Sequence, residues 1–341
     1  MRKLAFVAAA LALGSTANAQ LTQLFKLEDT TSALTWLNAG DQTRGMAYNP
    51  VTGNIIVVDR DSTSGNRPYS INGTSGAQIG AFDNTGITGG TFPVNKPLVD
   101  TDGRVYVTNG ATTAFKVYRW ADEASGPSSA ATTVYGPVTL AHRVGDDAAI
   151  TGGGANVKII TSGNGGTTSV YVLTDPENDG TFTQIQITMP AAITGIPQVD
   201  FDPDDDTKFW IREIPVTPAA KQFNVAAGAA VAGGAADITA VLPTNGASID
   251  VAKVGSLRLY ALGPGAVAAT TPGVVAQVFR TDETVARHST GDINRTGGAV
   301  ANGNAAGDIA LASNGNLYVL YTNNSLSGWS GVNSVEDWNL L

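Results

Sequence analysis

Cysteine is absent from the sequence, and histidine occurs only as His142 and His288. Without cysteine there are no disulfides, zinc–thiolate sites, iron–sulfur clusters or thiol nucleophiles. The absence also suits a chain that crosses an oxidising envelope without mispairing. Two widely separated histidines do not make a multi-histidine metal site. Ser/His/Asp catalysis is equally unsupported, because no G-x-S-x-G segment is present.

Basic residues are in the minority, with 20 Lys and Arg against 29 Asp and Glu, which gives a net charge of -9. Such a surface repels phosphate backbones, so no nucleic-acid partner is expected. Long hydrophobic runs are also missing. The Ala/Gly-rich stretch Val225–Ala236 is too short and too rich in glycine to span a bilayer, so no transmembrane segment is expected. Calcium, cationic polymers and glycans remain open as partners.

The first twenty residues carry the three parts of a secretory signal. Arg2 and Lys3 form a positive region, and Leu4–Leu13 is a short apolar run. Ala17–Ala19 (ANA) is a small-residue cleavage site that leaves Gln20 as the mature N-terminus. We expect residues 1–19 to be a signal peptide, residues 20–341 to be a single domain, and the protein to be secreted, periplasmic or displayed on the cell surface.

One pattern recurs along the mature chain at a spacing of about 50 residues, which is the length of a propeller blade. A short apolar strand leads into a turn rich in Asn, Asp and Gly, and a second strand rich in Val, Ile and Tyr follows. The six copies are Gly45–Arg60, Pro97–Gly110, Ile150–Gly163, Val199–Glu213, Ile249–Leu262 and Ile309–Thr322.

Further strands usually follow each copy, so the repeat predicts blades of four strands and an all-β, six-bladed β-propeller. Seven blades are the alternative count, and a β-sandwich or β-solenoid is the alternative architecture. Closing the ring removes two exposed sheet edges. We expect the isolated strand Gln23–Leu27 to complete the last blade beside Val335–Leu341, which pairs the N-terminal and C-terminal strands.

The repeat phrases carry a resemblance that covers most of the chain from about Leu24 onward. TRGMAYNPVTGNIIVVDR, KPLVDTDGRVYVTN and GDIALASNGNLYVLYTNN resemble a family of secreted bacterial β-propellers known as a domain of unknown function. These phrases are structural. The resemblance therefore implies the fold and export, and it implies no catalytic residues.

Asp175, Glu177 and Asp179 alternate along a loop that continues into Gly180. Oxygen ligands at alternate positions can wrap one calcium ion, and glycine allows the sharp turn. The loop departs from an EF-hand because Gln186 stands where a bidentate Glu is expected. The segment is also a good hairpin turn, so a calcium site and a plain turn are both open. Calcium is the one cofactor that the sequence suggests.

The central channel is the default place for a ligand in a propeller. The residues just before each first strand would lie at one mouth of it, and their mixed polar character would suit a small anion or a glycan. They are Arg44, Lys96, Arg143, Gln198, Ser248 and Asp308. A solvated mouth without a ligand is the alternative. Exposed Trp120, Trp329 or Trp338 could stack on sugar rings, although buried tryptophan is more common.

No catalytic motif is evident, so enzyme activity is not expected. The leading hypothesis is a monomeric secreted or cell-surface propeller that binds an extracellular protein or glycan. The alternative is an envelope hydrolase or lactonase with a metal at the channel mouth. Only Asp308, with Asp200 or Asp250, is available by register for that metal. A structural envelope component is a third hypothesis, and the fold itself does not choose among them.

Overall fold

A computed structural model describes residues 19–332, apart from residues 30–33, 62, 64, 215–218, 239–247, 264–270, 272, 284 and 303–305. The proposed signal segment, except for Ala19, lies outside these residues, as do Trp338 and the segment Val335–Leu341. Within the described part, no helix is long and apolar enough to cross a membrane.

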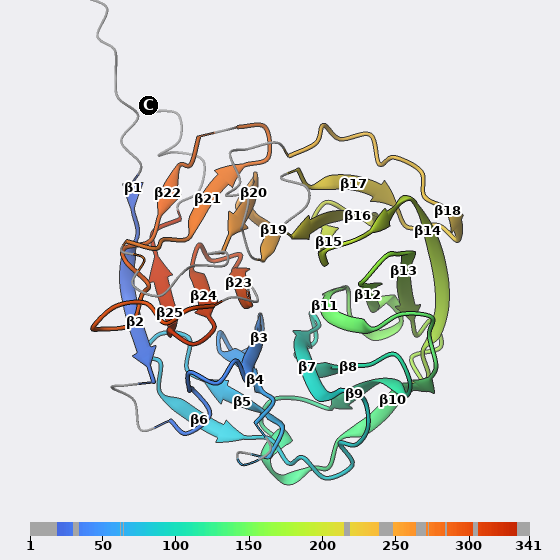
Figure 1. Ribbon diagram of the computed structural model, residues 1–341, viewed down its shortest axis with the longest axis horizontal. Coiled ribbons are helices and arrows are strands. Elements are labelled where there is room, and N and C mark those ends of the chain that lie inside the picture. Colours follow the sequence, from blue (N-terminus) through green and yellow to red (C-terminus); the bar gives the residue numbers. More distant parts are fainter. Residues whose placement is uncertain are drawn as a thin grey trace, which may run out of the picture.

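Six antiparallel sheets are arranged radially around a central axis, and each repeat copy supplies one sheet (Figure 1). The innermost strands are β3 (Thr43–Tyr48), β7 (Phe92–Val99), β11 (Val144–Thr151), β15 (Ile196–Asp202), β19 (Ile249–Val254) and β23 (Gly307–Leu311). Each of these strands packs against the next, and β23 returns to β3. The prediction of a six-bladed propeller is therefore confirmed, and the seven-bladed alternative is wrong.

The outer strands follow in chain order within each blade. The second strands are β4 (Ile55–Asp59), β8 (Val105–Gly110), β12 (Lys158–Gly163), β16 (Asp205–Ile214), β20 (Leu257–Leu262) and β24 (Leu317–Tyr321). The third strands are β5 (Arg67–Ile71), β9 (Phe115–Trp120), β13 (Thr167–Thr174), β17 (Lys221–Asn224), β21 (Gln277–Arg280) and β25 (Ser325–Ser330). The fourth strands are β6 (Gln78–Ala81), β10 (Thr132–Val138), β14 (Thr183–Ile193), β22 (His288–Ser289) and β2 (Thr22–Glu28).

Blades three, four and five depart from the four-strand plan. The short strands β18 (Gly228–Ala229) and β1 (Ala19–Gln20) run parallel to β14 and β22 and extend blades three and five. Blade four has three strands within the described residues. Next to them Ile238 forms an isolated bridge with Ala220, and residues 239–247 lie outside the described part.

The N-terminal strand closes the ring. β2 pairs with β25 in antiparallel register, with Leu27 opposite Leu326, so it completes blade six as predicted. The observed partner strand, Ser325–Ser330, precedes the predicted partner Val335–Leu341. Phe25 packs over Gly328, where an added Cβ would lie 2.5 Å from its ring. The absence of a side chain at Gly328 therefore lets Phe25 of β2 pack closely against β25.

Buried apolar side chains fill the spaces between neighbouring sheets. Leu259 and Ala261 of blade five pack with Ile309 and Val319 of blade six, and all four are buried. Full burial of a Leu, Ile or Val side chain contributes roughly 1.5–3 kcal/mol. Trp120 and Trp329 lie in such interfaces at 1% and 3% exposure. Neither of them is therefore available to stack on a sugar ring.

Two inner strands begin at least five residues earlier than the repeat predicts. β7 begins at Phe92 instead of Pro97, and β11 begins at Val144 instead of Ile150. The pairing register shifts between Phe92 and Lys96 and again between Val144 and Ala148. Such irregularities re-aim side chains at the rims of sheets. The repeat phrase did not include these strand starts, and they carry most of the site described next.

Candidate functional site

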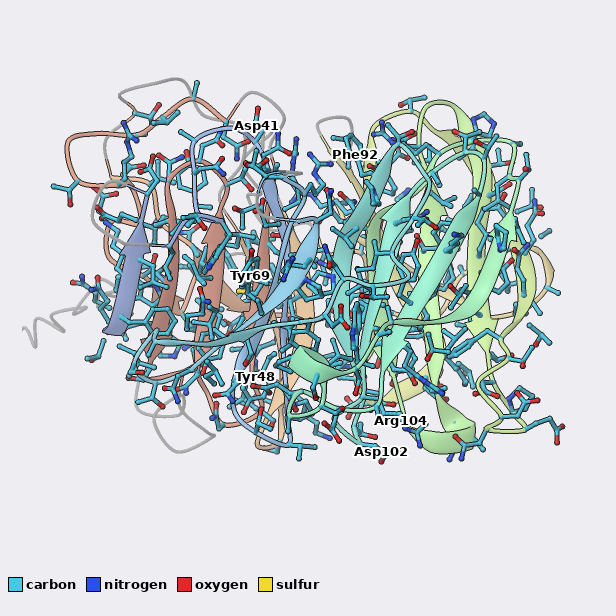
Figure 2. The ribbon with its side chains drawn as sticks, turned by 90° about the horizontal axis from the view of Figure 1, so that it is seen from below. Asp41, Tyr48, Tyr69, Phe92, Asp102 and Arg104 are labelled. Carbon is cyan, nitrogen blue, oxygen red and sulfur yellow. The ribbon has the colours of Figure 1, made fainter. Side chains whose placement is uncertain are left out.

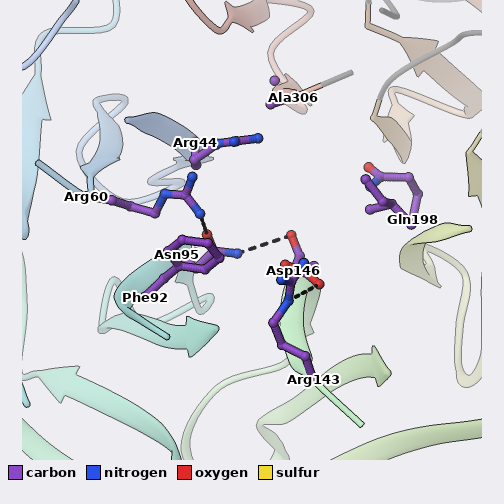
Figure 3. Close-up of a pocket in the computed structure, with 10 residues that line it drawn as sticks. Arg44, Arg60, Phe92, Asn95, Arg143, Asp146, Gln198 and Ala306 are labelled. Atoms are coloured by element: carbon purple, nitrogen blue, oxygen red, sulfur yellow. Dashed lines mark hydrogen bonds and ion pairs between the residues drawn. The ribbon is translucent and has the colours of Figure 1, made fainter. Parts of the chain in front are cut away.

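A pocket of about 240 Å³ lies at one mouth of the channel, and its polar side chains come from the inner strands of several blades (Figure 3). Phe92 places it at the face of the propeller that also carries Asp41 (Figure 2). Its side-chain lining consists of Arg44, Arg60, Phe92, Asn95, Arg143, Asp146, Ile196, Gln198 and Ala306.

A phenylalanine ring holds two of the three arginines in this pocket. The Arg60 guanidinium carbon lies 3.8 Å from the centre of the Phe92 ring, and that of Arg143 lies 5.5 Å from it. Guanidinium groups are attracted to the negative face of such a ring. Phe92 therefore fixes both cations close to each other, although their charges repel.

Neutral oxygen atoms satisfy part of the remaining donors. Arg60 Nη1 donates to Asn95 Oδ1 at 3.1 Å, and Arg60 Nη2 donates to the Asp41 carbonyl at 3.1 Å. Arg44 Nε donates to the same carbonyl at 2.8 Å. The Nε of Arg60 is buried without a hydrogen-bond partner in the described part of the chain. The pocket thus holds more donors than the protein's own acceptors satisfy.

Asp146 is the one carboxylate in the pocket lining. It forms an ion pair with Arg143, whose Nε lies 2.9 Å from Asp146 Oδ2. Burial raises the pKa of Asp146, against the opposing effect of Arg143, Arg60 and Arg44. Burial and the neighbouring Arg44 lower the pKa of Arg60 to about 9. Arg60 still carries its charge at neutral pH, so three cations face one lining carboxylate, and the charge of Asp41 beside the pocket also attracts Arg44 and Arg60.

A second charged group lies deeper in the channel and is balanced differently. Lys96 Nζ lies 3.0 Å from Asp147 Oδ1 and 2.5 Å from Asp308 Oδ2. Burial alone would lower the pKa of Lys96, but the two carboxylates raise it above its usual value. For Asp308 burial outweighs the attraction of Lys96 and raises its pKa to about 6. The ammonium group thus neutralises part of the negative charge in the channel.

Asp200 and Asp250 share the channel with this ion pair and hydrogen-bond to each other. Burial, and then the charge of Asp250, raise the pKa of Asp200 well above its usual value. Two adjacent carboxyl groups away from bulk water do not both ionise, because like charges repel strongly at short range. Of the two carboxyl groups, Asp200 is therefore the one that more readily keeps its proton.

The four channel carboxylates also join the blades. Inner strands present unpaired N–H groups towards the channel, and buried donors of this kind require an acceptor. Each carboxylate accepts such a bond from the next blade: Asp147 from Val199 (2.8 Å), Asp200 from Val251 (2.6 Å), Asp250 from Leu311 and Asp308 from Met46 (2.7 Å). Blade one carries Gly45 in its inner strand, where an added Cβ would lie 2.5 Å from Pro97 of blade two.

The structure divides the residues predicted for the channel mouth into two groups. Arg44, Arg143 and Gln198 line the mouth pocket. Lys96 and Asp308 lie deeper and contact each other. Ser248 is buried, and its hydroxyl has no partner in the described part.

The calcium prediction falls on a well-formed hairpin turn between β13 and β14. Asp175 accepts hydrogen bonds from the N–H groups of Asp179 (3.1 Å) and Gly180 (2.9 Å). Asp179 accepts one from Thr181 (2.7 Å), and Glu177 is exposed. The described residues contain no group of three or more His, Asp or Glu side chains arranged to hold a metal ion. Calcium binding here stays a prediction.

Several residues of the site were not singled out from the sequence. Phe92, Asn95 and Asp146 precede the repeat phrase in their copies, and Arg60 is the last residue of its copy. The sequence feature that could have indicated them is the segment Arg143–Ala149 (RVGDDAA), in which an arginine and two aspartates precede a predicted strand. Asp147 of that segment completes the ion pairs of Lys96. Asp200 and Asp250, which the repeat register had made available at the channel, do lie there.

The fold and this channel define the protein as a six-bladed β-propeller. Its structure is similar to that of a DUF4623 family protein from Bacteroides eggerthii DSM 20697, with a TM-score of 0.60 and 15% identity over 92% of this chain and 77% of that chain. It is also similar to the RRP9 WD40 repeats, with a TM-score of 0.53 and 10% identity over 92% and 99% of the two chains. No family model and no curated protein matches the sequence.

These likenesses establish the fold. The DUF4623 protein belongs to a domain of unknown function, which is the kind of relative that the repeat phrases suggested. At such identities the function has to be argued from the site of this chain.

Proposed function

We propose that this chain is an exported binding propeller whose mouth pocket takes the anionic group of an extracellular ligand. One observation carries the proposal: Arg44, Arg60 and Arg143 face a single pocket in which Asp146 is the only lining carboxylate. The sequence has a net charge of -9, so an excess of positive charge at this point runs against the average of the chain.

The energetic argument rests on desolvation. Arg44 and Arg60 are half-buried, and burial lowers the pKa of both. A cation that has lost water without gaining an anion raises the free energy of the folded state. An incoming anion supplies charge-assisted hydrogen bonds, which are roughly twice as strong as neutral ones. Part of the cost of holding these cations together is therefore recovered only when a ligand binds.

The ligand class that we propose is a saccharide bearing a carboxylate. Planar guanidinium groups match the two oxygens of a carboxylate. The amide of Gln198 lies across the pocket from Arg60 (Figure 3) and offers a polar partner for a hydroxyl group. The volume of about 240 Å³ suits one small group rather than an extended chain.

The alternative, a hydrolase with a metal at the channel, is less well supported. Its metal would need to sit among the channel carboxylates, and Lys96 Nζ already lies between Asp147 and Asp308. Asp200 and Asp250 are engaged with each other and with backbone N–H groups. The carboxylates therefore have a structural use that requires no ion.

Titration calorimetry at low salt with glucuronate, and with glucose as the uncharged comparison, tests the proposal. We expect glucuronate to bind, glucose to bind at least tenfold more weakly, and Arg44→Met or Arg60→Met to lower the glucuronate affinity at least tenfold. The matched control is Arg280→Met, because Arg280 is already paired with Asp282 at 3.1 Å. Equal affinity in Arg44→Met, Arg60→Met and Arg280→Met would reject the mouth pocket as the site.

A further inference from the structure

A second pocket, of about 340 Å³, lies between blades two and three on the opposite face of the propeller. Figure 2 shows Arg104 of this pocket at one end of the molecule and Phe92 of the mouth pocket at the other. Its polar lining comes from Arg104, Arg119, Trp120, Ser129, Thr132 and Asn178. No charged side chain in this lining is acidic.

Arg119 differs from most surface arginines of this chain. Arg258, Arg280, Arg287 and Arg295 each have a carboxylate within 3.1 Å. The side chain of Arg119 has no ion pair or hydrogen bond within the described residues, although it is half-buried. The guanidinium group of Arg119 lies against the β13–β14 turn of blade three. A Cβ atom added to Gly180 in that turn would lie 3.0 Å from Arg119 Nη2. A partly desolvated cation therefore stands beside a cavity without an anion.

The neighbouring arginine is held in place by the turn that had been considered for calcium. Arg104 Nη1 donates to Asn178 Oδ1 at 3.1 Å, and Asp102 is its nearest carboxylate at 3.6 Å. Asn178 has a φ of 53°, a left-handed conformation that asparagine tolerates better than most residues. Asp175 fixes that turn by accepting two of its N–H groups. The acidic loop thus positions one wall of the pocket.

Trp120 borders this pocket but offers it no donor. Its indole N–H is fully buried, and its ring packs on Phe82 between blades one and two, with 5.4 Å between the ring centroids. The charged donors beside the cavity are therefore the guanidinium groups of Arg104 and Arg119.

We propose that this pocket, here called the rim pocket, is a second binding site that takes an oxyanion group such as a sulfate, phosphate or carboxylate. The charged donors are the guanidinium groups of Arg104 and Arg119. Ser129 and Thr132 add hydroxyl groups. The cavity is larger than the mouth pocket, so the anion can belong to a larger molecule. The site does not depend on the mouth pocket.

The test follows the arginine Nε–H signals of the ¹⁵N-labelled protein by NMR during titration with sulfate, phosphate and acetate at low salt. Arg104→Met and Arg119→Met assign the signals of the two arginines. We expect both signals to move and saturate with at least one of the three anions. The affinity read from the Arg104 signal should fall at least tenfold in Arg119→Met, because a charge-assisted hydrogen bond is lost. It should be unchanged in Arg44→Met and Arg280→Met.

The indole N–H signals report whether Arg119→Met keeps its fold, and Arg104→Met, read from the Arg119 signal, is the second variant if it does not. Arg104 and Arg119 signals that stay fixed with all three anions overturn the proposal. So does a shift of the Arg104 signal with the same size and midpoint in Arg119→Met and Arg280→Met. Failure of glucuronate binding at the mouth would leave this result unaffected, because the two pockets lie on opposite faces.

Discussion

The channel and its mouth use the same inner strands and the same kinds of charged residue, yet they balance charge in different ways. In the channel, Lys96 lies between Asp147 and Asp308, and each carboxylate also accepts a backbone N–H from the next blade. At the mouth, Arg44 and Arg60 hydrogen-bond to neutral oxygens. The channel cation is thus paired within the protein, whereas the three cations at the mouth are balanced only in part, by Asp146 and Asp41.

The difference separates structural charges from charges available to a ligand. A buried ion pair that loses one partner destabilises the fold, since the other charge stays buried and unpaired. A cation held against neutral oxygens can be replaced with little loss of stability, but a bound anion would lose its partner. Stability should therefore respond to changes in the channel, and binding should respond to changes at the mouth.

The largest effect is expected for Lys96→Met. This change leaves Asp147 and Asp308 without their cation, and it should lower the free energy of unfolding by about 3–5 kcal/mol at neutral pH. The measurement is urea denaturation. Lys208→Met is the matched control, because Lys208 forms an exposed pair with Asp205 at 3.1 Å, which should contribute less than about 1 kcal/mol. An equal loss of unfolding free energy in Lys96→Met and Lys208→Met would contradict the structural role of the channel charges.

The pH dependence of stability tests the state of Asp308. Its pKa is raised from 3.8 to about 6 in the folded state, so the folded protein binds more protons than the unfolded chain between these values. Stability from this group is therefore greatest in acid and is lost as the pH rises from about 4 to 6. Other groups affect the wild type and Asp308→Asn alike, so the difference between the two isolates Asp308.

Urea denaturation at pH 4 and pH 7 gives that difference. Between the two pH values, the wild type should gain roughly 2–3 kcal/mol relative to Asp308→Asn on acidification. A difference that is the same at both pH values would mean that Asp308 has an ordinary pKa and that its charge is fully compensated.

A smaller effect on stability is expected at the mouth. Arg44→Met removes a half-buried cation that donates to one backbone carbonyl, and it also relieves repulsion from Arg60 and Arg143. The free energy of unfolding should change by less than about 1 kcal/mol, as for most substitutions outside the core. A loss as large as that of Lys96→Met would place Arg44 among the structural charges and weaken the proposed ligand site.

The smallest effect is expected for calcium. Asp175 and Asp179 already accept backbone N–H groups in their turn, which makes this loop resemble the compensated channel. The melting midpoint in millimolar calcium should equal that in chelator. Binding at a hundredfold excess over the dissociation constant would instead add about 2.7 kcal/mol of stability. A raised midpoint that Asp179→Asn abolishes would establish the calcium site.

Much of the fold could be predicted because the repeat is local. Alternating apolar residues and Asn/Gly-rich turns specify the first two strands of each blade, and these match β3 with β4 and β23 with β24 closely. The ring closure followed from the isolated strand at Gln23–Leu27 and the physical cost of open sheet edges. The three-stranded part of blade four and the added strands β1 and β18 could not be predicted, since they depend on neighbouring chain segments.

The sequence by itself determined the strand periodicity, the blade count and the presence of polar residues near each inner strand. Only the tertiary structure decided which of these charged side chains lie close together in space. Arg44, Arg60 and Arg143 are far apart in the chain, and bulged strand starts and the Phe92 ring bring them into one pocket. Charge balance depends on distances of a few ångströms across different blades, and no repeat pattern encodes those distances.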